Sequence, residues 1–234
     1  HPIAMTKRRK WTAIPGLLAL AAGAVMLSAY SGASSSQNYS PEQPIHFPHT
    51  VHVQKLGMNC LYCHNAANKS MDPGLPAVST CMGCHKLIGP DRPANDLHDN
   101  KPYHSTEIEK LYKFADVKSV GMDMGPNAKP IPWNRLHKLP EYVHFPHTRH
   151  INAGVTCQTC HGQIQKMQQV YQFASLNMGW CVSCHVNGYS PQEGEQAAGY
   201  SAAQQGVPGA TPAAVTTAST ERKKARYDCA NCHY

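Results

Sequence analysis

The ten cysteines of this sequence form five Cys-x-x-Cys pairs, and a histidine directly follows the second cysteine of every pair. This pattern is typical of covalent haem attachment, in which the two thiols form thioethers with the haem vinyl groups and the histidine binds the iron from one side. We therefore predict five covalently bound c-type haems, and we number their attachment sites 1 to 5 in chain order. The residues are Cys60, Cys63 and His64 (site 1); Cys81, Cys84 and His85 (site 2); Cys157, Cys160 and His161 (site 3); Cys181, Cys184 and His185 (site 4); and Cys229, Cys232 and His233 (site 5).

Three other roles of cysteine pairs fit this pattern less well. Structural zinc commonly takes two such pairs per metal ion, so five pairs leave one pair over. A thioredoxin-like redox motif needs only a single pair. Disulfide bonds explain an even number of cysteines, but not a histidine after every second one. Five matches with no cysteine left over favour haem.

Length and composition predict a thin polypeptide around these cofactors. The chain has 234 residues, of which 8% are aromatic, and a mean hydropathy of -0.44. About 47 residues are available per haem, too few for a separate apolar core around each one. The predicted fold class is therefore a multihaem cytochrome c, with short α-helices and long ordered loops wrapped around five haems and little β-structure.

The N-terminal sequence predicts a membrane anchor. Residues 1–10 end in a basic cluster, and an uncharged run follows over residues 11–30. Twenty helical residues are about 30 Å long, the thickness of a bilayer core. The positive-inside rule then puts residues 1–10 in the cytoplasm and the haem-binding part on the periplasmic side of a bacterial cell membrane. A signal peptide cleaved near Ala29-Tyr30-Ser31 is the alternative.

An internal repeat divides the rest of the chain. The segment 45–52 (IHFPHTVH) recurs as 143–150 (VHFPHTRH), and two attachment sites follow each copy. Beyond the second copy and its sites, the chain becomes rich in Ala, Gly, Gln, Ser, Thr and Pro, a composition typical of a linker. The predicted domains are a first dihaem module (31–130), a second dihaem module (131–189), a low-complexity linker (190–226) and the fifth haem site (227–234).

Two helices are expected between the motifs. Over residues 105–115, Thr106 and Glu109 are expected to form a capping box, and the apolar side chains share one face. A second amphipathic stretch covers residues 162–174, with apolar side chains on one side and Gln and Lys on the other.

Each iron also needs a second axial ligand if it only transfers electrons. Both copies of the repeat contain the pattern F-x-H-x-x-H, which resembles that of the low-potential multihaem cytochromes c3 and c7. This resemblance implies that His49 binds the iron of site 1 and His147 that of site 3. It also implies that His52 and His150 reach the irons of other sites and link the modules. With His137, the sequence supplies five distal histidines for five irons.

Methionines are the competing distal ligands, and a methionine would raise the potential of the haem that it binds. Met178 lies three residues before site 4, and Met71 and Met167 are further candidates. Met167 is on the apolar face of the second expected helix and is better explained as a core residue. The other histidines are expected on the surface or beside haem propionates; they are His46, His98, His104 and His144.

Three longer stretches carry a second resemblance: 130–140 (PIPWNRLHKLP), 154–157 (GVTC) and 177–181 (NMGWC). With the repeat, they look like the pentahaem cytochrome c subunit of alternative complex III, a quinol:electron-acceptor oxidoreductase. This resemblance implies a relay of quinol-derived electrons to a monohaem cytochrome, a soluble carrier or an oxidase, with no catalytic residue in this subunit itself.

The same resemblance implies several protein partners. They are an iron–sulfur subunit resembling molybdopterin oxidoreductases, quinol-binding integral membrane subunits and a monohaem cytochrome c subunit. Nucleic acid is not expected as a partner, because Lys7 to Lys10 supply four of the charges behind the net +7 and are explained by membrane topology.

Other multihaem functions remain open at this point. A catalytic enzyme such as a pentahaem nitrite reductase needs an open iron position, whereas this chain has enough histidines to close every site. A stand-alone, membrane-anchored quinol dehydrogenase would itself oxidise quinol. A reaction-centre cytochrome would have a methionine before each motif, and only Met178 fits that requirement.

The five motifs predict a specific mass. When the chain is produced with c-type haem maturation, its intact mass should exceed that of the bare polypeptide by five haems. Replacing both cysteines of one motif by alanine should remove one haem. A mass equal to the polypeptide alone, or a content of zinc in place of iron, would refute haem attachment.

Overall fold

The computed structural model of the chain describes residues 13–30, 36–93, 102–190, 222 and 224–233. The predicted cytoplasmic segment, almost all of the predicted linker and His98 lie outside these residues. The described elements are α1 (Ala13–Tyr30), η1 (Thr50–Lys55), α2 (Cys60–Cys63), α3 (Val78–His85), β1 (Asp91–Arg92), β2 (Tyr103–His104), α4 (Thr106–Ala115), α5 (His147–Asn152), α6 (Cys157–His161), η3 (Ile164–Lys166), α7 (Met178–Asn187) and α10 (Cys229–Cys232).

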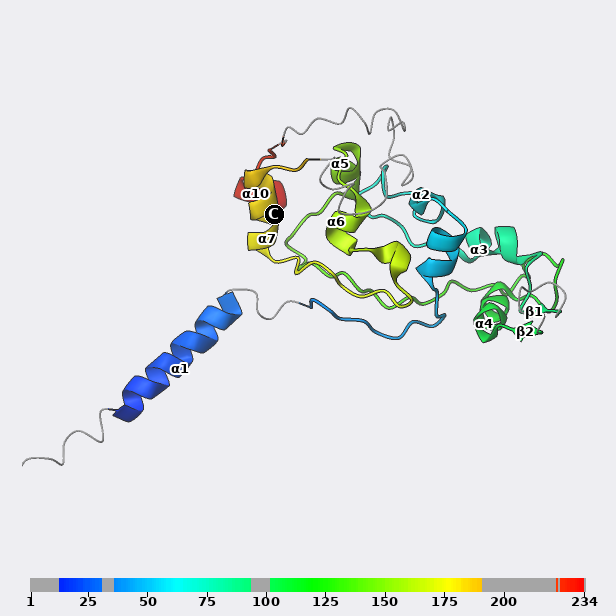
Figure 1. The fold of residues 1–234 in the computed structure, drawn as a ribbon, viewed down its shortest axis with the longest axis horizontal. Helices are drawn as coiled ribbons and strands as arrows, with labels where there is room; N and C mark the ends of the chain where they lie inside the picture. The colour runs from blue at the N-terminus through cyan, green and yellow to red at the C-terminus, as the bar shows by residue number, and fades with distance from the viewer. Residues whose placement is uncertain (1–12, 31–35, 94–101, 191–221, 223, 234) are drawn as a thin grey trace, which may run out of the picture.

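Short helices joined by long loops make up the described chain (Figure 1). Apart from α1, the helices have ten residues or fewer. The sheet consists of β1 and β2, an antiparallel pair in which Asp91 lies opposite His104. The prediction of a mostly helical, loop-rich chain with little β-structure is confirmed.

The helix α1 lies within the predicted transmembrane anchor of residues 11–30. Its 18 residues give a length of about 27 Å, which is less than the thickness of a bilayer core. Within the part of the chain that the structure describes, no helix has both the length and the apolar character required to span a membrane. The prediction of a transmembrane helix is therefore not supported.

The main apolar cluster joins α3 to α4. Ala115 is completely buried, and Leu111 and Tyr112 are each 5% exposed. These α4 side chains pack against α3 and the neighbouring loops, because α4 presents its apolar residues on one face. The cluster consists of Ile45, Val78, Met82, Leu111, Tyr112, Ala115, Val117 and Ile131.

The helix α4 forms in the segment where the sequence predicts a helix, but with a different cap. Ser105 is the N-cap residue, and its hydroxyl accepts a hydrogen bond from the Ile108 backbone N–H at 3.3 Å. The predicted capping box of Thr106 and Glu109 is wrong, because Glu109 instead forms an ion pair with Lys113 one turn along the helix.

The second amphipathic helix is not formed. Residues 162–174 contain only the three-residue turn η3. Gly162 has a φ of 70°, and a Cβ there would lie 2.7 Å from the Phe173 ring, so the chain turns sharply after α6. Gln165 and Gln172 are buried, at 2% and 1% exposure. The expected helix required these glutamines to face solvent.

The segment that contains Gln172 pairs instead with the start of the haem-binding part. The Asn38 N–H donates to the Gln172 carbonyl oxygen at 2.7 Å, and the Gln172 N–H donates to the Tyr39 carbonyl oxygen at 2.9 Å. These contacts connect residues more than 130 positions apart in the sequence. The local spacing of apolar residues cannot predict hydrogen bonds between segments so far apart in the sequence.

Replacing Leu111 by alanine should lower the free energy of unfolding of the haem-loaded protein by about 2–5 kcal/mol, because it leaves a cavity in the main apolar cluster. Lys113→Ala is the matched control on the same helix; its exposed ion pair should contribute less than about 1 kcal/mol. Denaturant unfolding followed by circular dichroism measures both. Equal midpoints for the two variants would contradict the assignment of this cluster as the core.

Candidate functional site

Each Cys-x-x-Cys-His motif lies on a short helix: α2, α3, α6, α7 or α10. The helical turn brings cysteines three residues apart onto one side. Two of these helices begin with an asparagine cap, since Asn59 accepts a hydrogen bond from the Leu61 N–H and Asn177 accepts one from the Trp180 N–H, both at 2.8 Å. All ten cysteines lie among the described residues and have free thiols.

The two copies of the repeat have the same side-chain geometry. In the first copy, the Phe47 ring meets His49 edge-on, with centroids 5.0 Å apart, and stacks on His52 at 4.3 Å. In the second copy, Phe145 meets His147 edge-on at 4.9 Å and stacks on His150 at 4.2 Å. In each copy, one phenylalanine therefore orients two imidazole rings at once.

The stacked histidine of each copy faces the histidine of an attachment motif. The ring centroids of His52 and His85 (site 2) are 6.2 Å apart, and those of His150 and His185 (site 4) are 6.1 Å apart. Two imidazoles that bind one metal ion from opposite sides have centroids about 6 Å apart, since each metal–nitrogen bond is about 2 Å long and each ring centre lies about 1 Å beyond its nitrogen. Both pairs fit an iron between them.

Each of these pairs joins a histidine of the repeat to the motif histidine of an attachment site in the same module. His52 faces site 2, which follows it in the first module, and His150 faces site 4 in the second. Binding of the irons of other sites by His52 and His150 stays a prediction, and in this placement each histidine faces a site of its own module. The link between the modules comes from other residues.

Main-chain carbonyl groups set the orientation of most of these rings. A hydrogen bond from Nδ1 to a carbonyl oxygen leaves Nε2 as the nitrogen that is available to a metal. Six of the ten predicted histidine ligands have this contact. The pairs are His52 with Pro48 (3.3 Å), His64 with Gly74 (3.0 Å), His85 with Ile88 (2.9 Å), His147 with Met71 (2.9 Å), His150 with Pro146 (3.0 Å) and His185 with Arg226 (2.6 Å).

Burial keeps the central imidazoles neutral. It lowers the pKa of His161 to about 3 and that of His49 to about 4, and neighbouring histidines add to both shifts. Burial also lowers the pKa of His52, His147 and His150. A neutral imidazole is the form that binds a metal, so these shifts favour ligation at neutral pH.

Sites 1 and 3 lie together at the centre of the molecule. The Cys60 and Cys157 side chains lie beside each other, and their interaction lowers the pKa of Cys60 and raises that of Cys157. The His147 ring faces His161, with centroids 6.5 Å apart and planes 17° apart. This spacing also fits an iron, as the cytochrome c3 resemblance implies for His147.

His137 lies at site 3 as well. Its ring contacts the His161 ring edge-on, with centroids 4.4 Å apart, too close for a metal ion between the two rings. The His137 Nε2 and the His49 Nδ1 are buried polar atoms without a hydrogen-bond partner. Burial lowers the pKa of His137. His137 and His147 are therefore two neutral imidazoles beside the same motif histidine.

Site 5 has a neighbour that the sequence analysis does not identify. The Tyr142 ring stacks on His233, with centroids 5.7 Å apart. Val143 forms a β-bridge with His233, and the His144 N–H donates to the Cys232 carbonyl oxygen at 2.9 Å. The sequence contains one signal that could have identified Tyr142. The two copies of the repeat differ at this position, because the first copy has Pro44 where the second has Tyr142.

The remaining described histidines make other contacts. The His46 Nε2 lies 3.1 Å from the Gln168 carbonyl oxygen, so this nitrogen already has a partner. His104 lies between Asp91 (2.7 Å) and Glu109 (3.5 Å), and the Asp91 hydrogen bond raises its pKa. Among the residues that the structure describes, no three or more His, Cys, Asp and Glu side chains are grouped so as to hold a metal ion.

The competing methionines differ in exposure. Met178 is 64% exposed at the start of α7, and Met71 is 48% exposed. Met167 is buried, as expected of a core residue. The carbonyl group of Met71, not its thioether, contacts a ring of the site, because it accepts the hydrogen bond of His147.

Comparison with known proteins adds one similarity. The chain is 24% identical, over 166 residues, to the multihaem cytochrome c subunit of menaquinone reductase from Nitratidesulfovibrio vulgaris. The matched part is 62% of this chain and 69% of the relative. No family model matches the chain.

In the haem-loaded protein, His52→Ala should convert the iron of site 2 from low spin to high spin, because His52 faces His85 at a distance that fits a shared iron. About one fifth of the low-spin signal should be lost, as one of five irons changes. Electron paramagnetic resonance of the oxidised protein measures the change. His46→Ala is the control from the same repeat and should leave the signal intact. An unchanged spectrum of His52→Ala would remove His52 from the ligands.

Proposed function

We propose that this protein is a pentahaem cytochrome c that transfers electrons as a subunit of a quinone-linked respiratory or photosynthetic complex. One observation carries the proposal: at sites 2 and 4, a histidine of the repeat faces the motif histidine at about 6 Å, and both rings have Nδ1 bonded to a carbonyl group. The similarity to a multihaem cytochrome c subunit of menaquinone reductase supports covalently bound c-type haem in a multisubunit complex.

Each haem, when bound, supplies a one-electron redox centre. The thiols of each motif would hold the porphyrin, and the motif histidine would bind the iron. At sites 2 and 4, His52 and His150 would be the further iron ligands, and their neutral imidazoles suit that role. With two histidine ligands each, sites 2 and 4 would have no position for a substrate, which supports electron transfer at these two sites.

The finer proposal is a complex like alternative complex III. Its other members are an iron–sulfur subunit resembling molybdopterin oxidoreductases, quinol-binding integral membrane subunits and a monohaem cytochrome c. The haem-binding part then works on the periplasmic side of the membrane. In this assembly, electrons leave quinol and pass through the chain towards a cytochrome, a soluble carrier or an oxidase.

The similarity to a menaquinone reductase subunit favours a second candidate, in which electrons pass in the opposite direction. In that case the chain delivers electrons from a periplasmic donor to the quinone-binding subunits. Both candidates need the same closed iron sites, and they differ in which partner reduces the chain.

Purification of the tagged chain from its native membrane in mild detergent tests the function. The chain should co-purify with membrane subunits, and menaquinol should reduce its haems in the intact complex but not in the isolated chain. Oxidation of the haems by added menaquinone would favour the second candidate. Quinol oxidation by the isolated chain would contradict a subunit role and support a stand-alone dehydrogenase.

A further inference from the structure

The attachment sites do not follow one another in space as they do in the sequence. Site 1 is next to site 3, because the His147 ring that faces His161 of site 3 is hydrogen-bonded through Nδ1 to the Met71 carbonyl oxygen, in the loop after site 1, at 2.9 Å. The helix α5, which precedes site 3, is bonded to the loop that follows site 1. Its His147 N–H donates to the Met71 carbonyl oxygen, and its Thr148 N–H donates to the Ser70 carbonyl oxygen, both at 3.2 Å.

A reciprocal contact joins the modules from the other side. The turn η1, which precedes site 1, packs against η3, which follows site 3. In each module, the element that carries the repeat histidines (η1 or α5) therefore contacts the loop that follows the first attachment site of the other module. The two modules meet through their first sites, 1 and 3.

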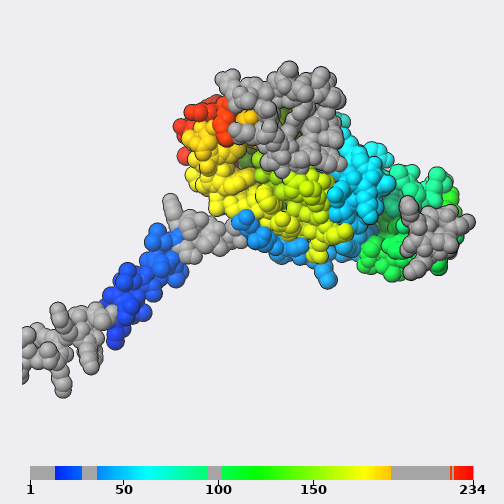
Figure 2. Space-filling model, in the orientation of Figure 1, coloured from blue at the N-terminus to red at the C-terminus, as the bar shows by residue number. Residues whose placement is uncertain are grey.

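Site 2 lies outside this central pair. His85 faces His52, and the Tyr112 hydroxyl of α4 donates to the His85 carbonyl oxygen at 2.7 Å. In Figure 1, α3 lies between α2 and the end of the molecule formed by α4, β1 and β2. In the space-filling view, this end carries the green residues, opposite the yellow and red ones (Figure 2).

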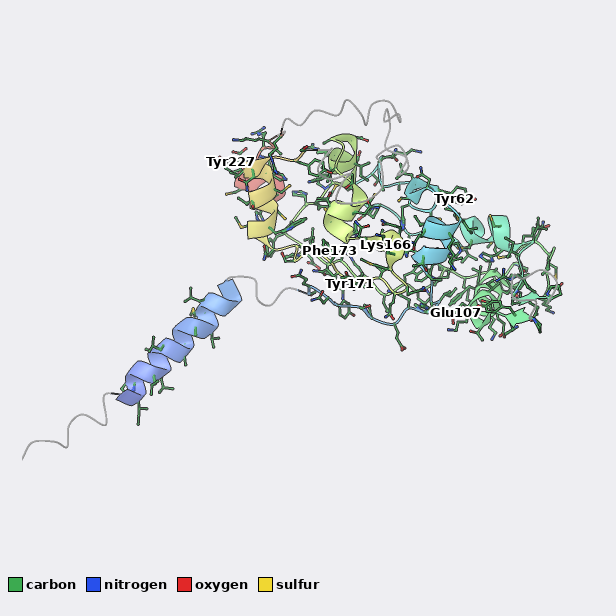
Figure 3. All side chains as sticks on the ribbon, viewed as in Figure 1. Tyr62, Glu107, Lys166, Tyr171, Phe173 and Tyr227 are labelled. Carbon is green, nitrogen blue, oxygen red and sulfur yellow. The ribbon has the colours of Figure 1, made fainter. Side chains whose placement is uncertain are left out.

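Sites 4 and 5 lie on the other side of site 3. The Arg226 carbonyl oxygen accepts the hydrogen bond of His185, and the Ala225 N–H donates to the His185 carbonyl oxygen at 3.1 Å. The segment that leads into site 5 is therefore attached to site 4, and α10 lies against α7 in Figure 1. Tyr227 lies near this end, and Glu107 of α4 lies near the opposite end (Figure 3).

We propose that the attachment sites form one row in the order 2–1–3–4–5, so that site 2 and site 5 are its two ends. The proposal rests on the proposed function, because a row of sites has meaning only if haems occupy them. Electron transfer slows steeply with distance, so each haem exchanges electrons mainly with its spatial neighbours. Partners then meet the row at the α3–α4 end and at the α7–α10 end.

The two ends present different surfaces to partners. At the site 5 end, Lys224, Arg226 and Tyr227 are exposed, with Arg226 bonded to Asp228. At the site 2 end, Leu87 is 75% exposed and Val120 is 50% exposed, beside the ion pair of Lys86 and Asp123. The site 5 end thus exposes Lys224 beside the Arg226–Asp228 ion pair, whereas the site 2 end exposes apolar side chains beside the Lys86–Asp123 ion pair.

A haem-loaded protein fixed to an electrode by its site 5 end tests the order. Lys224→Cys adds one free thiol for attachment to gold, since thioethers occupy the native cysteines. In this background, Cys81→Ala with Cys84→Ala removes site 2, and Cys60→Ala with Cys63→Ala removes site 1. Fast-scan voltammetry then counts the electrons that each molecule exchanges rapidly, and intact mass confirms four haems in each variant.

The row 2–1–3–4–5 predicts opposite results for the two variants. Loss of site 2 removes only the far end, so all four remaining haems should exchange rapidly. Loss of site 1 isolates site 2, so rapid exchange should fall from four electrons to three. Four rapid electrons without site 1 and three without site 2 would show the chain order 1–2–3–4–5 and overturn the proposal.

The site 2 variant is decisive alone if the site 1 variant does not fold, because a count of three rapid electrons without site 2 contradicts the row. A failure of haem attachment, on which the proposed function depends, gives a different result. In that case the parent protein carries no haem, its mass equals that of the polypeptide, and no voltammetric signal appears for any variant.

Discussion

A hydrogen bond from the Nδ1 of an imidazole to a main-chain carbonyl oxygen orients the histidines on which the rest of this structure depends. It determines which nitrogen is free and turns the ring about its own axis. The carbonyl groups come from very different places: Pro48 lies four residues before His52, whereas Met71 belongs to the opposite module from His147. The long loops of this chain therefore have a structural task, since they bring carbonyl groups to the rings.

Little of the described chain forms an ordinary apolar core. The one large cluster joins α3 to α4 and supports the backbone at His85 through Tyr112. The second module has buried glutamines instead, and Gln158 donates a hydrogen bond to Gln165 at 3.2 Å. The amide NH2 groups of these glutamines donate hydrogen bonds that fix the surrounding loops, whereas the Oε1 atoms of Gln158 and Gln172 are buried without a hydrogen-bond partner.

The motifs, the histidine repeat and helix α4 could be predicted because their signals are local. The spacing of Cys60, Cys63 and His64 follows from haem chemistry alone, and α4 shows its apolar face within ten residues. The expected helix over residues 162–174 failed because Gln172 pairs with Tyr39, far away in the sequence. The position of His137 beside His161 and the contact of site 1 with site 3 also depend on long-range contacts, which a linear pattern does not record.

The matching geometry of Phe47 and Phe145 has an evolutionary consequence. Each of the segments 45–85 and 143–185 carries its own orienting phenylalanine, two repeat histidines and two cysteine pairs, so copying the gene segment copies a complete ligand geometry. A multihaem protein of this kind can gain haem sites by duplication of a whole segment, because each duplicated segment already contains the ligands that its haems need. Sequence differences between the copies then concentrate in the segments outside the repeated units, such as the insertion that contains α4 and the C-terminal segment that carries the last cysteine pair.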